Sequence, residues 1–443
     1  MSKPADLILS AYSFIYANTL EKLLSLGHHF KDGKPIPSFD ENLLVDLCSE
    51  VQQIFSDEEI ILQLKGNFVI VGNINGSLHD LIRVLKYSHD NGSKLLFLGD
   101  YIDIGDFSLE CLSLLFAKKV SQPDSIFLIR GEHEFSSICN EYGFKNDIIN
   151  GYNFEPFNQS KYKIVEQGQS QISNDNSTNK KGNGCYKYTE KLYSAIMKVF
   201  SYLPLAALVN ETTFCIHGGL SPKLHLIDNI NKVIKRPLYL FEDNSLLTDM
   251  LYSDPTNSNR GLFIKKTTTR GHLFNQESVI IFLEDNSLTR MVRSHQYVIS
   301  GSIKSFNDRC ITISSASKYD RFDSINSAVF ELFQKNNGYR ITTFFPIRRL
   351  SKKEALFYKV PCFRETEKKI PLSISLIQPQ MLPSKSVTSR DTESRKSSQR
   401  SDQICASSRL TFINPLKAQL KAKKFARKPL LHESFSADFQ ESD

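Results

Sequence analysis

Residues 94–105 read KLLFLGDYIDIG, an apolar run that stops at a glycine and is followed by two aspartates. A short apolar run without polar alternation is typical of a strand that is buried on both faces of a sheet. Asp100 and Asp103 then lie in the loop at the carboxyl end of this strand. Because ligands of α/β sheets bind at the carboxyl ends of the strands, the stretch predicts both a fold class and the position of a site.

Similar apolar runs flank this one at residues 67–71 and 125–129, and each is followed by a glycine loop. Between the three runs, residues 78–87 and 109–120 carry apolar side chains at helical spacing. The alternation predicts parallel strands joined by crossover helices, and therefore an α/β fold. Later apolar stretches predict further strands at 205–209, 213–216, 309–314, 328–333 and 339–344.

Histidines and carboxylates follow several of the predicted strand ends. The set comprises Asp100, Asp103, Glu132, His133, His217 and His295. Imidazole and carboxylate groups at the mouths of several strands are what a transition-metal site requires. Any one of these histidines alone is better explained as an ordinary hydrogen-bonded loop residue. The ordered joint pattern favours a metal site over that alternative.

The order of these motifs resembles the calcineurin-like metallophosphoesterases, and within them the PPP family of serine/threonine protein phosphatases. The matching stretches are Gly72-Asn-Ile-Asn-Gly76, Gly99-Asp-Tyr-Ile-Asp-Ile-Gly105, Arg130-Gly-Glu-His-Glu134, His217-Gly-Gly-Leu-Ser-Pro222, Tyr252-Ser-Asp-Pro255, Arg270-Gly271, Arg293-Ser-His295 and Ser314-Ser-Ala-Ser-Lys-Tyr319. The resemblance implies the calcineurin-like metallophosphoesterase fold, in which helices flank a central β-sandwich and a metal site lies at the carboxyl ends of the strands.

By this resemblance, two metal ions would lie side by side and activate a hydroxide for in-line attack on phosphorus. Where the family's first metal has an aspartate and a histidine, this sequence has Asn73 and Asn75. Amide carbonyls are poor ligands for transition metals, so an ion there should bind far more weakly or not at all. We therefore expect one ion (Mn, Fe or Zn) at the second position. The candidate metal-binding residues are then Asp100, Glu132, His217 and His295, and Glu132 adds a negative charge where the family has the neutral amide of an asparagine.

The resemblance also assigns proton transfer and phosphate binding. His133, oriented by Asp103, would protonate the leaving alkoxide. Arg270 would clamp the phosphoryl oxygens, and Tyr319 would lie beside the substrate groove. The family's second clamping arginine is replaced here by Ile104. Removing a charge stabiliser of this kind lowers rates by roughly 10²–10³ in comparable sites.

Two functions are consistent with this mixture of kept and lost residues. The first is a serine/threonine phosphatase-like protein with impaired catalysis, a pseudophosphatase that binds phosphoproteins or regulatory subunits. Asn73, Asn75 and Ile104 favour it. The alternative is an active metal-dependent phosphatase that hydrolyses phosphoserine and phosphothreonine with a modified metal site, which the retained His133 and Arg270 favour. The sequence leaves open whether the chain is an enzyme.

The chain has 443 residues and a formal net charge of +7, which is distributed unevenly. Residues 351–443 hold 18 Lys and Arg against 10 Asp and Glu, a net of +8, so residues 1–350 carry about −1. A nearly neutral body gives no clear indication of nucleic-acid binding. The basic residues 417–428 are explained by a solvated basic helix or coil, with a segment for an acidic partner or an import receptor as one alternative and binding to nucleic acid or a membrane as another.

Shifts in composition predict the domain boundaries. We expect an N-terminal helical extension at 1–35, a PPP-type phosphatase domain at 36–348 with a polar insertion at 147–185, and a basic, serine-rich, disordered tail at 349–443. Ser38 and Glu41 have the spacing of a capping box, which predicts that a helix begins there.

The remaining sequence features bear on the cellular compartment of the protein. Eight scattered cysteines without a CxxC pair argue against a zinc ribbon or a disulfide framework. No stretch reaches the roughly 18 uninterrupted apolar residues that span a bilayer. The start of the chain also lacks the pattern of a signal peptide. We expect a cytoplasmic or nuclear protein, or one found in both.

Overall fold

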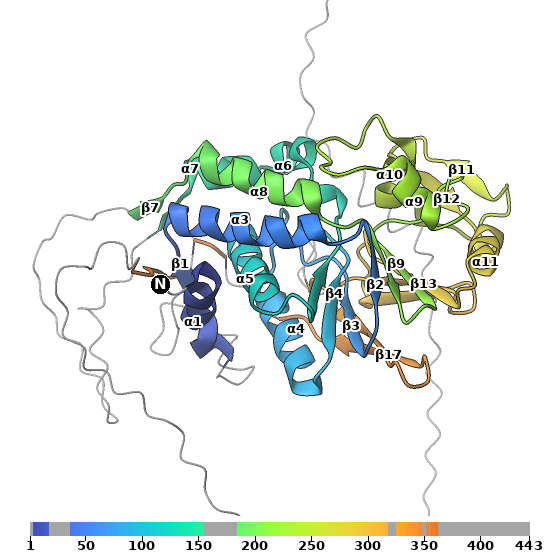
Figure 1. The fold of residues 1–443 in the computed structure, drawn as a ribbon, viewed down its shortest axis with the longest axis horizontal. Helices are drawn as coiled ribbons and strands as arrows, with labels where there is room; N and C mark the ends of the chain where they lie inside the picture. Colours follow the sequence, from blue (N-terminus) through green and yellow to red (C-terminus); the bar gives the residue numbers. More distant parts are fainter. Residues whose placement is uncertain are drawn as a thin grey trace, which may run out of the picture. The chain divides into compact units, whose positions relative to one another are not determined.

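A computed structural model describes residues 3–16, 36–154, 184–317, 325–347, 351–353 and 355–361. All of them belong to one compact unit, Met1–Pro371. Two β-sheets form the centre of this unit, and helices cover both (Figure 1).

The first sheet has the strand order β17-β16-β3-β4-β5. Its strands are β3 (Phe68–Val71), β4 (Lys94–Phe97), β5 (Ile126–Leu128), β16 (Ser327–Leu332) and β17 (Tyr339–Phe344). Strands β3, β4 and β5 are parallel, as the predicted crossover helices require. Strand β16 extends the sheet antiparallel to β3, and β17 in turn pairs antiparallel with β16.

The second sheet has the strand order β14-β15-β13-β9-β8-β2. Its strands are β2 (Ile61–Leu64), β8 (Ala206–Val209), β9 (Thr213–Ile216), β13 (Arg290–Arg293), β14 (Ser302–Ser305) and β15 (Cys310–Ile313). At its centre, β9, β13 and β15 are parallel, so their carboxyl ends lie at one edge of the sheet.

Side chains that alternate along each central strand fill the space on both sides of it. Phe68 and Ile70 of β3 belong to the hydrophobic cluster between the sheets, together with Cys215 of β9. Val69 and Val71 belong instead to the cluster that includes the covering helices. Because both faces of β3 are buried, its sequence shows a continuous apolar run rather than polar alternation.

Helices cover the outer faces of the two sheets (Figure 1). On the first sheet these are α1 (Pro4–Tyr16), α3 (Glu41–Asp57), α4 (Leu78–Asn91), α5 (Ser108–Ser121) and α8 (Glu190–Tyr202). On the second they are α9 (Asp228–Val233), α10 (Ser245–Tyr252) and α11 (Gln276–Asp285). None of the described helices is long and apolar enough to cross a membrane.

The remaining helices and strands of the described residues are short. They are η1 (Glu132–Glu134), α6 (Ser136–Tyr142), α7 (Phe144–Asn150), β1 (Ile36–Ser38), β18 (Phe357–Lys359), β6 (Tyr152–Phe154), β7 (Gly184–Tyr186), β10 (Asp254–Pro255), β11 (Phe263–Lys265) and β12 (His272–Phe274). Strand β18 lies within the predicted tail and pairs in parallel with β1. Residues 155–183 of the predicted insertion, and the tail beyond residue 361, lie outside the described residues. The predicted domain boundaries stay predictions.

The predicted capping box at the start of α3 is wrong. Asp40 is the N-cap, and its side chain accepts a hydrogen bond from the amide of Asn42. Ser38 lies in β1, where its hydroxyl donates to the carbonyl of Tyr358 at 3.0 Å. The carboxylate of Glu41 instead accepts from the amide and hydroxyl of Thr189, each at 2.7 Å. Because β1 pairs with β18, the Ser38 hydroxyl is bonded there and does not cap α3, as the local sequence pattern had suggested.

Candidate functional site

The loops that follow β4, β5 and β9 approach one another very closely. A Cβ atom on Gly131 would lie 2.3 Å from Oδ1 of Asp100. One on Gly99 would lie 2.4 Å from the amide nitrogen of Gly131, and Gly99 also has a φ of +97°. Only glycine fits such positions, so the glycines that end the apolar runs are what allow the polar loops to meet.

A fully buried carboxylate, that of Glu134, holds the loop of Asp100 in place. Its Oε2 accepts from the amides of Asp100 and Gly131, each at 2.9 Å, and its Oε1 from the amide of Tyr101 at 2.8 Å. Asp100 itself has a φ of +57°, in the left-handed region. A buried acceptor for three amides stabilises this unfavourable backbone and fixes the direction of the Asp100 side chain.

Replacing Glu134 by glutamine is expected to lower the free energy of unfolding by roughly 2–3 kcal/mol, because one oxygen becomes an NH₂ group that faces buried amide donors. Urea denaturation measures this change. Glu141→Gln is the matched control, since Glu141 is exposed and close in sequence. A difference between the two variants below about 0.5 kcal/mol would contradict the assigned role of Glu134.

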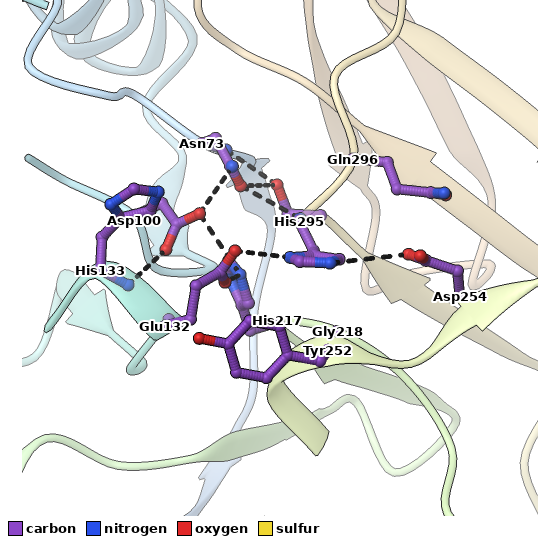
Figure 2. Close-up of polar contacts among 12 residues, drawn as sticks. Asn73, Asp100, Glu132, His133, His217, Gly218, Tyr252, Asp254, His295 and Gln296 are labelled. Carbon is purple, nitrogen blue, oxygen red and sulfur yellow. Dashed lines mark hydrogen bonds and ion pairs between the residues drawn. The ribbon is translucent and has the colours of Figure 1, made fainter. Parts of the chain in front are cut away.

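Glu132 lies between His217 and His295 (Figure 2). Its Oε1 is 2.7 Å from Nδ1 of His295, and its Oε2 contacts Nε2 of His217. Nε2 of His217 is also 3.4 Å from Oδ2 of Asp100. Ligand atoms of Glu132, His217 and His295 all lie within 4.8 Å of one another, and the same holds for those of Asp100, Glu132 and His133.

The hydrogen bonds around this cluster show that a cation fits it. Nδ1 of His217 lies 2.6 Å from the carbonyl of Leu98 and must be its donor. In the neutral imidazole, the lone pair on Nε2 then faces Glu132 and Asp100. Among the described residues, neither Nε2 of His217 nor Oε2 of Glu132 has a hydrogen-bond partner beyond these ion-pair contacts. Two acceptors in contact require a proton or a metal ion between them, and this donor set suits a divalent transition metal.

The pKa values around the cluster reflect the same need for positive charge. Burial lowers the pKa of His217, but Asp100 and Glu132 outweigh it and raise that pKa to about 9. Burial and the charge of Glu132 raise the pKa of Asp100 to about 6. Both shifts mean that the carboxylates attract a cation strongly.

His133 and Asp103 form the pair that the sequence predicted. Nδ1 of His133 is 2.7 Å from Oδ2 of Asp103, and both side chains are buried. Burial lowers the pKa of His133, whereas Asp100 and the hydrogen bond that His133 donates to Asp103 raise it, to about 10 overall. The imidazole therefore holds its proton at neutral pH, as a general acid would require.

Neighbouring residues hold both the nitrogen and the oxygen of the Asn73 side-chain amide (Figure 2). Its Nδ2 donates to Oδ2 of Asp100 at 2.8 Å. Its Oδ1 accepts from the hydroxyl of Ser294 at 2.5 Å and from the amide of His295 at 3.1 Å. Because the amide of His295 can only donate, the orientation of the Asn73 amide is fixed. Asn73 therefore presents an NH₂ group, not an oxygen, toward Asp100.

Asn75 and Ile104 also differ from the family, and they lie in adjoining loops, since the amide of Asn75 donates to the carbonyl of Asp100 and the amide of Gly105 donates to the carbonyl of Asn75. Asn75 is buried, and its Oδ1 makes no hydrogen bond among the described residues. Ile104 follows Asp103 and has a φ of +47°. A β-branched residue in the left-handed region is an outlier, so the backbone of the loop is unfavourable at Ile104. The loop keeps this conformation although the isoleucine side chain carries no charge.

The structure describes only one of the two predicted phosphate-binding residues. Arg270 is exposed, and its guanidinium lies over the rings of Phe241 at 5.1 Å and Tyr252 at 5.5 Å. Tyr319 lies outside the described residues. Asp100, Asp103, Glu132, His133, His217 and His295 all come together at the strand ends, and Asn73, Asn75 and Ile104 lie beside them.

Sequence reasoning missed the supporting roles of Glu134, Ser294, Asp254 and Tyr252. Oδ1 of Asp254 accepts from the Arg293 guanidinium at 3.0 Å and lies 3.8 Å from Nε2 of His295. The hydroxyl of Tyr252 is buried near Glu132. All four residues lie within the quoted motifs, so the signal was present, but a role in positioning leaves no distinct pattern.

Comparisons with known proteins agree with this architecture. A family model described as calcineurin-like phosphoesterase matches residues 66–298. The serine/threonine-protein phosphatase 4 catalytic subunit of Saccharomyces cerevisiae is 31% identical over 301 residues, which span 68% of this chain and 83% of that protein. A solved protein serine/threonine phosphatase from Saccharomyces cerevisiae, described as similar to human phosphatase PP5, has a TM-score of 0.56 at 22% identity, over 71% of this chain and 92% of that one. The predicted fold class is confirmed.

Proposed function

Since the chain belongs to the calcineurin-like phosphoesterases, and within them to the PPP family of serine/threonine protein phosphatases, we propose that it is a phosphatase-like protein with impaired catalysis. Its site would bind phosphoserine or phosphothreonine side chains of partner proteins rather than turn them over efficiently.

The observation that carries this proposal is the hydrogen bonding of Asn73. An ion at the first metal position would need an oxygen from this residue beside Asp100, but the Oδ1 atom is held by Ser294 and by the amide of His295. Turning the amide over would place its NH₂ group against another donor, the His295 amide, and lose the bond to Asp100. A first ion is therefore disfavoured by geometry as well as by ligand type.

We propose that the second position holds one divalent or transition metal ion through Glu132, His217 and His295, with Asp100 beside them. The ion would supply Lewis-acid stabilisation of the phosphoryl oxygens. The chain's own contributions are the orientation of both imidazoles, through the Leu98 carbonyl and Asp254, and the protonated His133.

Phosphate would be bound by Arg270, with Tyr319 as a further proposed contact. The partner at position 104 is an isoleucine, which supplies no charge-assisted hydrogen bond to the charge that develops in the transition state. Losing one metal and one arginine affects the same transition state, so the two losses need not add. Their combination supports binding without efficient turnover.

An active enzyme with a modified site is the second candidate. The observation that favours it is the intact pair of His133 and Asp103 at 2.7 Å, which is the arrangement of an oriented general acid. In this case Glu132 would stand in for the family's amide ligand, and one ion would be enough to activate water.

Hydrolysis by the full chain separates the two candidates. We expect wild type and His133→Ala, each with Mn²⁺, to hydrolyse p-nitrophenyl phosphate and a phosphoserine peptide at rates within a few-fold of each other, because transition-state stabilisation is already lost. A wild type that turns over at least roughly 100-fold faster than His133→Ala would favour the active enzyme.

Partners follow from the proposed site and from the relative, which is described as a catalytic subunit. We propose a phosphoprotein or a regulatory subunit as the partner of the described unit. The basic segment at 417–428, with its proposed acidic partner or import receptor, lies outside the described residues, and the cytoplasmic or nuclear location stays a prediction.

A further inference from the structure

Tyr252, the last residue of α10, has a buried hydroxyl that makes no hydrogen bond among the described residues. Buried polar atoms nearly always have a partner in native proteins, so an unpaired one needs an explanation. Figure 2 shows the phenol ring below the metal-binding cluster, with its oxygen on the side of Glu132 and away from Asp254. The unpaired hydroxyl therefore faces the candidate site.

The ring of Tyr252 is held on several sides. Its centroid lies 5.4 Å from that of Phe241 and 5.7 Å from that of His295, which it meets edge-on at 81°. The guanidinium of Arg270 lies 5.5 Å from the ring centroid. These contacts leave the ring little room to turn, so the hydroxyl keeps its direction into the site.

The groups around the hydroxyl define what it could bind. Glu132, Arg270, Asp100 and Tyr142 are the charged or titratable groups that act on it most strongly. An oxyanion held by Arg270 and by an ion beside Glu132 would lie in the same space. A phenol donates one hydrogen bond and is neutral at pH 7, which suits an anionic oxygen between these groups.

We propose that the Tyr252 hydroxyl donates a hydrogen bond to the phosphoryl oxygens of a bound phosphate monoester, beside Arg270, and so provides part of the clamp that Ile104 does not. This inference rests on the proposed function, because it requires that the site bind a phosphoryl group. Tyr252 is then a specificity-determining residue of that site.

A neutral hydroxyl and the arginine that the family has in place of Ile104 affect phosphate binding and turnover differently. A hydroxyl binds the phosphoryl oxygens in the ground state, but it adds no positive charge against the charge that develops during transfer. Interactions of equal strength in the ground state and the transition state tighten binding without raising turnover. The substitution of Ile104 and the presence of Tyr252 therefore both favour binding over hydrolysis.

Titration of inorganic phosphate into the full chain in the presence of Mn²⁺, by calorimetry, tests the inference. Tyr252→Phe keeps the ring and removes only the hydroxyl, and we expect phosphate to bind roughly tenfold more weakly. Tyr239→Phe is the matched control, because Tyr239 is exposed and is not one of the groups around the hydroxyl, and it should change affinity less than about twofold.

Thermal unfolding of the ligand-free protein supplies a second readout. Because the hydroxyl makes no hydrogen bond within the described part of the chain, Tyr252→Phe should unfold at the wild-type temperature or above it. A clearly lower temperature would mean that the hydroxyl supports the fold, and would overturn the inference.

The outcomes of the titration separate the two proposals. Equal affinity of wild type and Tyr252→Phe, or equal losses in Tyr252→Phe and Tyr239→Phe, would overturn the role of Tyr252 and leave the proposed function standing. A wild type that binds no phosphate would overturn the proposed function and the inference together.

Discussion

Restoring the family residues at four positions is expected to raise hydrolysis of p-nitrophenyl phosphate by at least roughly 100-fold over wild type. The variant combines Asn73→Asp, Asn75→His, Ile104→Arg and Glu132→Asn. It returns charged and imidazole ligands to the first metal position and a guanidinium to the phosphate clamp. Steady-state turnover of the full chain with Mn²⁺ measures the gain.

The local geometry suits the substitution at position 73. One oxygen of an aspartate there keeps the hydrogen bonds from Ser294 and the His295 amide. The other oxygen then faces Oδ2 of Asp100, which is now 2.8 Å from Nδ2 of Asn73. Two carboxylates this close repel unless a cation lies between them. The restored variant should therefore also gain thermal stability from Mn²⁺ more than wild type does.

His133→Ala in the restored background is the control for this experiment. It removes the proton donor and should return turnover to within a few-fold of the wild-type rate. A folded, metal-loaded variant that shows no gain would mean that catalysis fails for a reason other than these four positions, and would count against the proposed cause of impairment.

The second large effect concerns metal binding. His217→Ala and His295→Ala should each weaken binding of Mn²⁺ by more than about 100-fold, because removing a ligand exceeds the 10–100-fold cost of removing the groups that support a ligand. Equilibrium dialysis with metal analysis gives the affinities. His225→Ala serves as the control, since His225 is exposed and lies outside the cluster. Unchanged affinity in both ligand variants would place the ion elsewhere.

Much of the fold is predictable from the sequence because buried strands carry a strong local signal. The apolar runs around residues 68–71, 94–97 and 213–216 are all strands. Within each sheet, parallel strands place their carboxyl ends at one edge, which brings Asp100 near Glu132 and His217 near His295. The meeting of the two pairs across the two sheets was implied by the family resemblance. Here the physical rule and the resemblance to a family led to the same residues.

Other features depend on contacts between distant segments and leave no local pattern. Ser38 has the right spacing for a capping box, but pairing of β1 with β18, more than 300 residues later in the chain, takes its hydroxyl. The amide of Asn73 is fixed by Ser294 and His295, more than 200 residues away. Sequence alone identified Asn73 as a poor ligand; only the structure shows that it turns its nitrogen toward Asp100.

The number of metal ions bound by the full chain tests the central claim most directly. Elemental analysis of the purified protein, after dialysis against excess Mn²⁺ and removal of free metal, gives this number per chain. Because the Asn73 amide is fixed with its nitrogen toward Asp100, we predict about one equivalent, lost in His217→Ala. Two tightly bound equivalents in wild type would contradict the account.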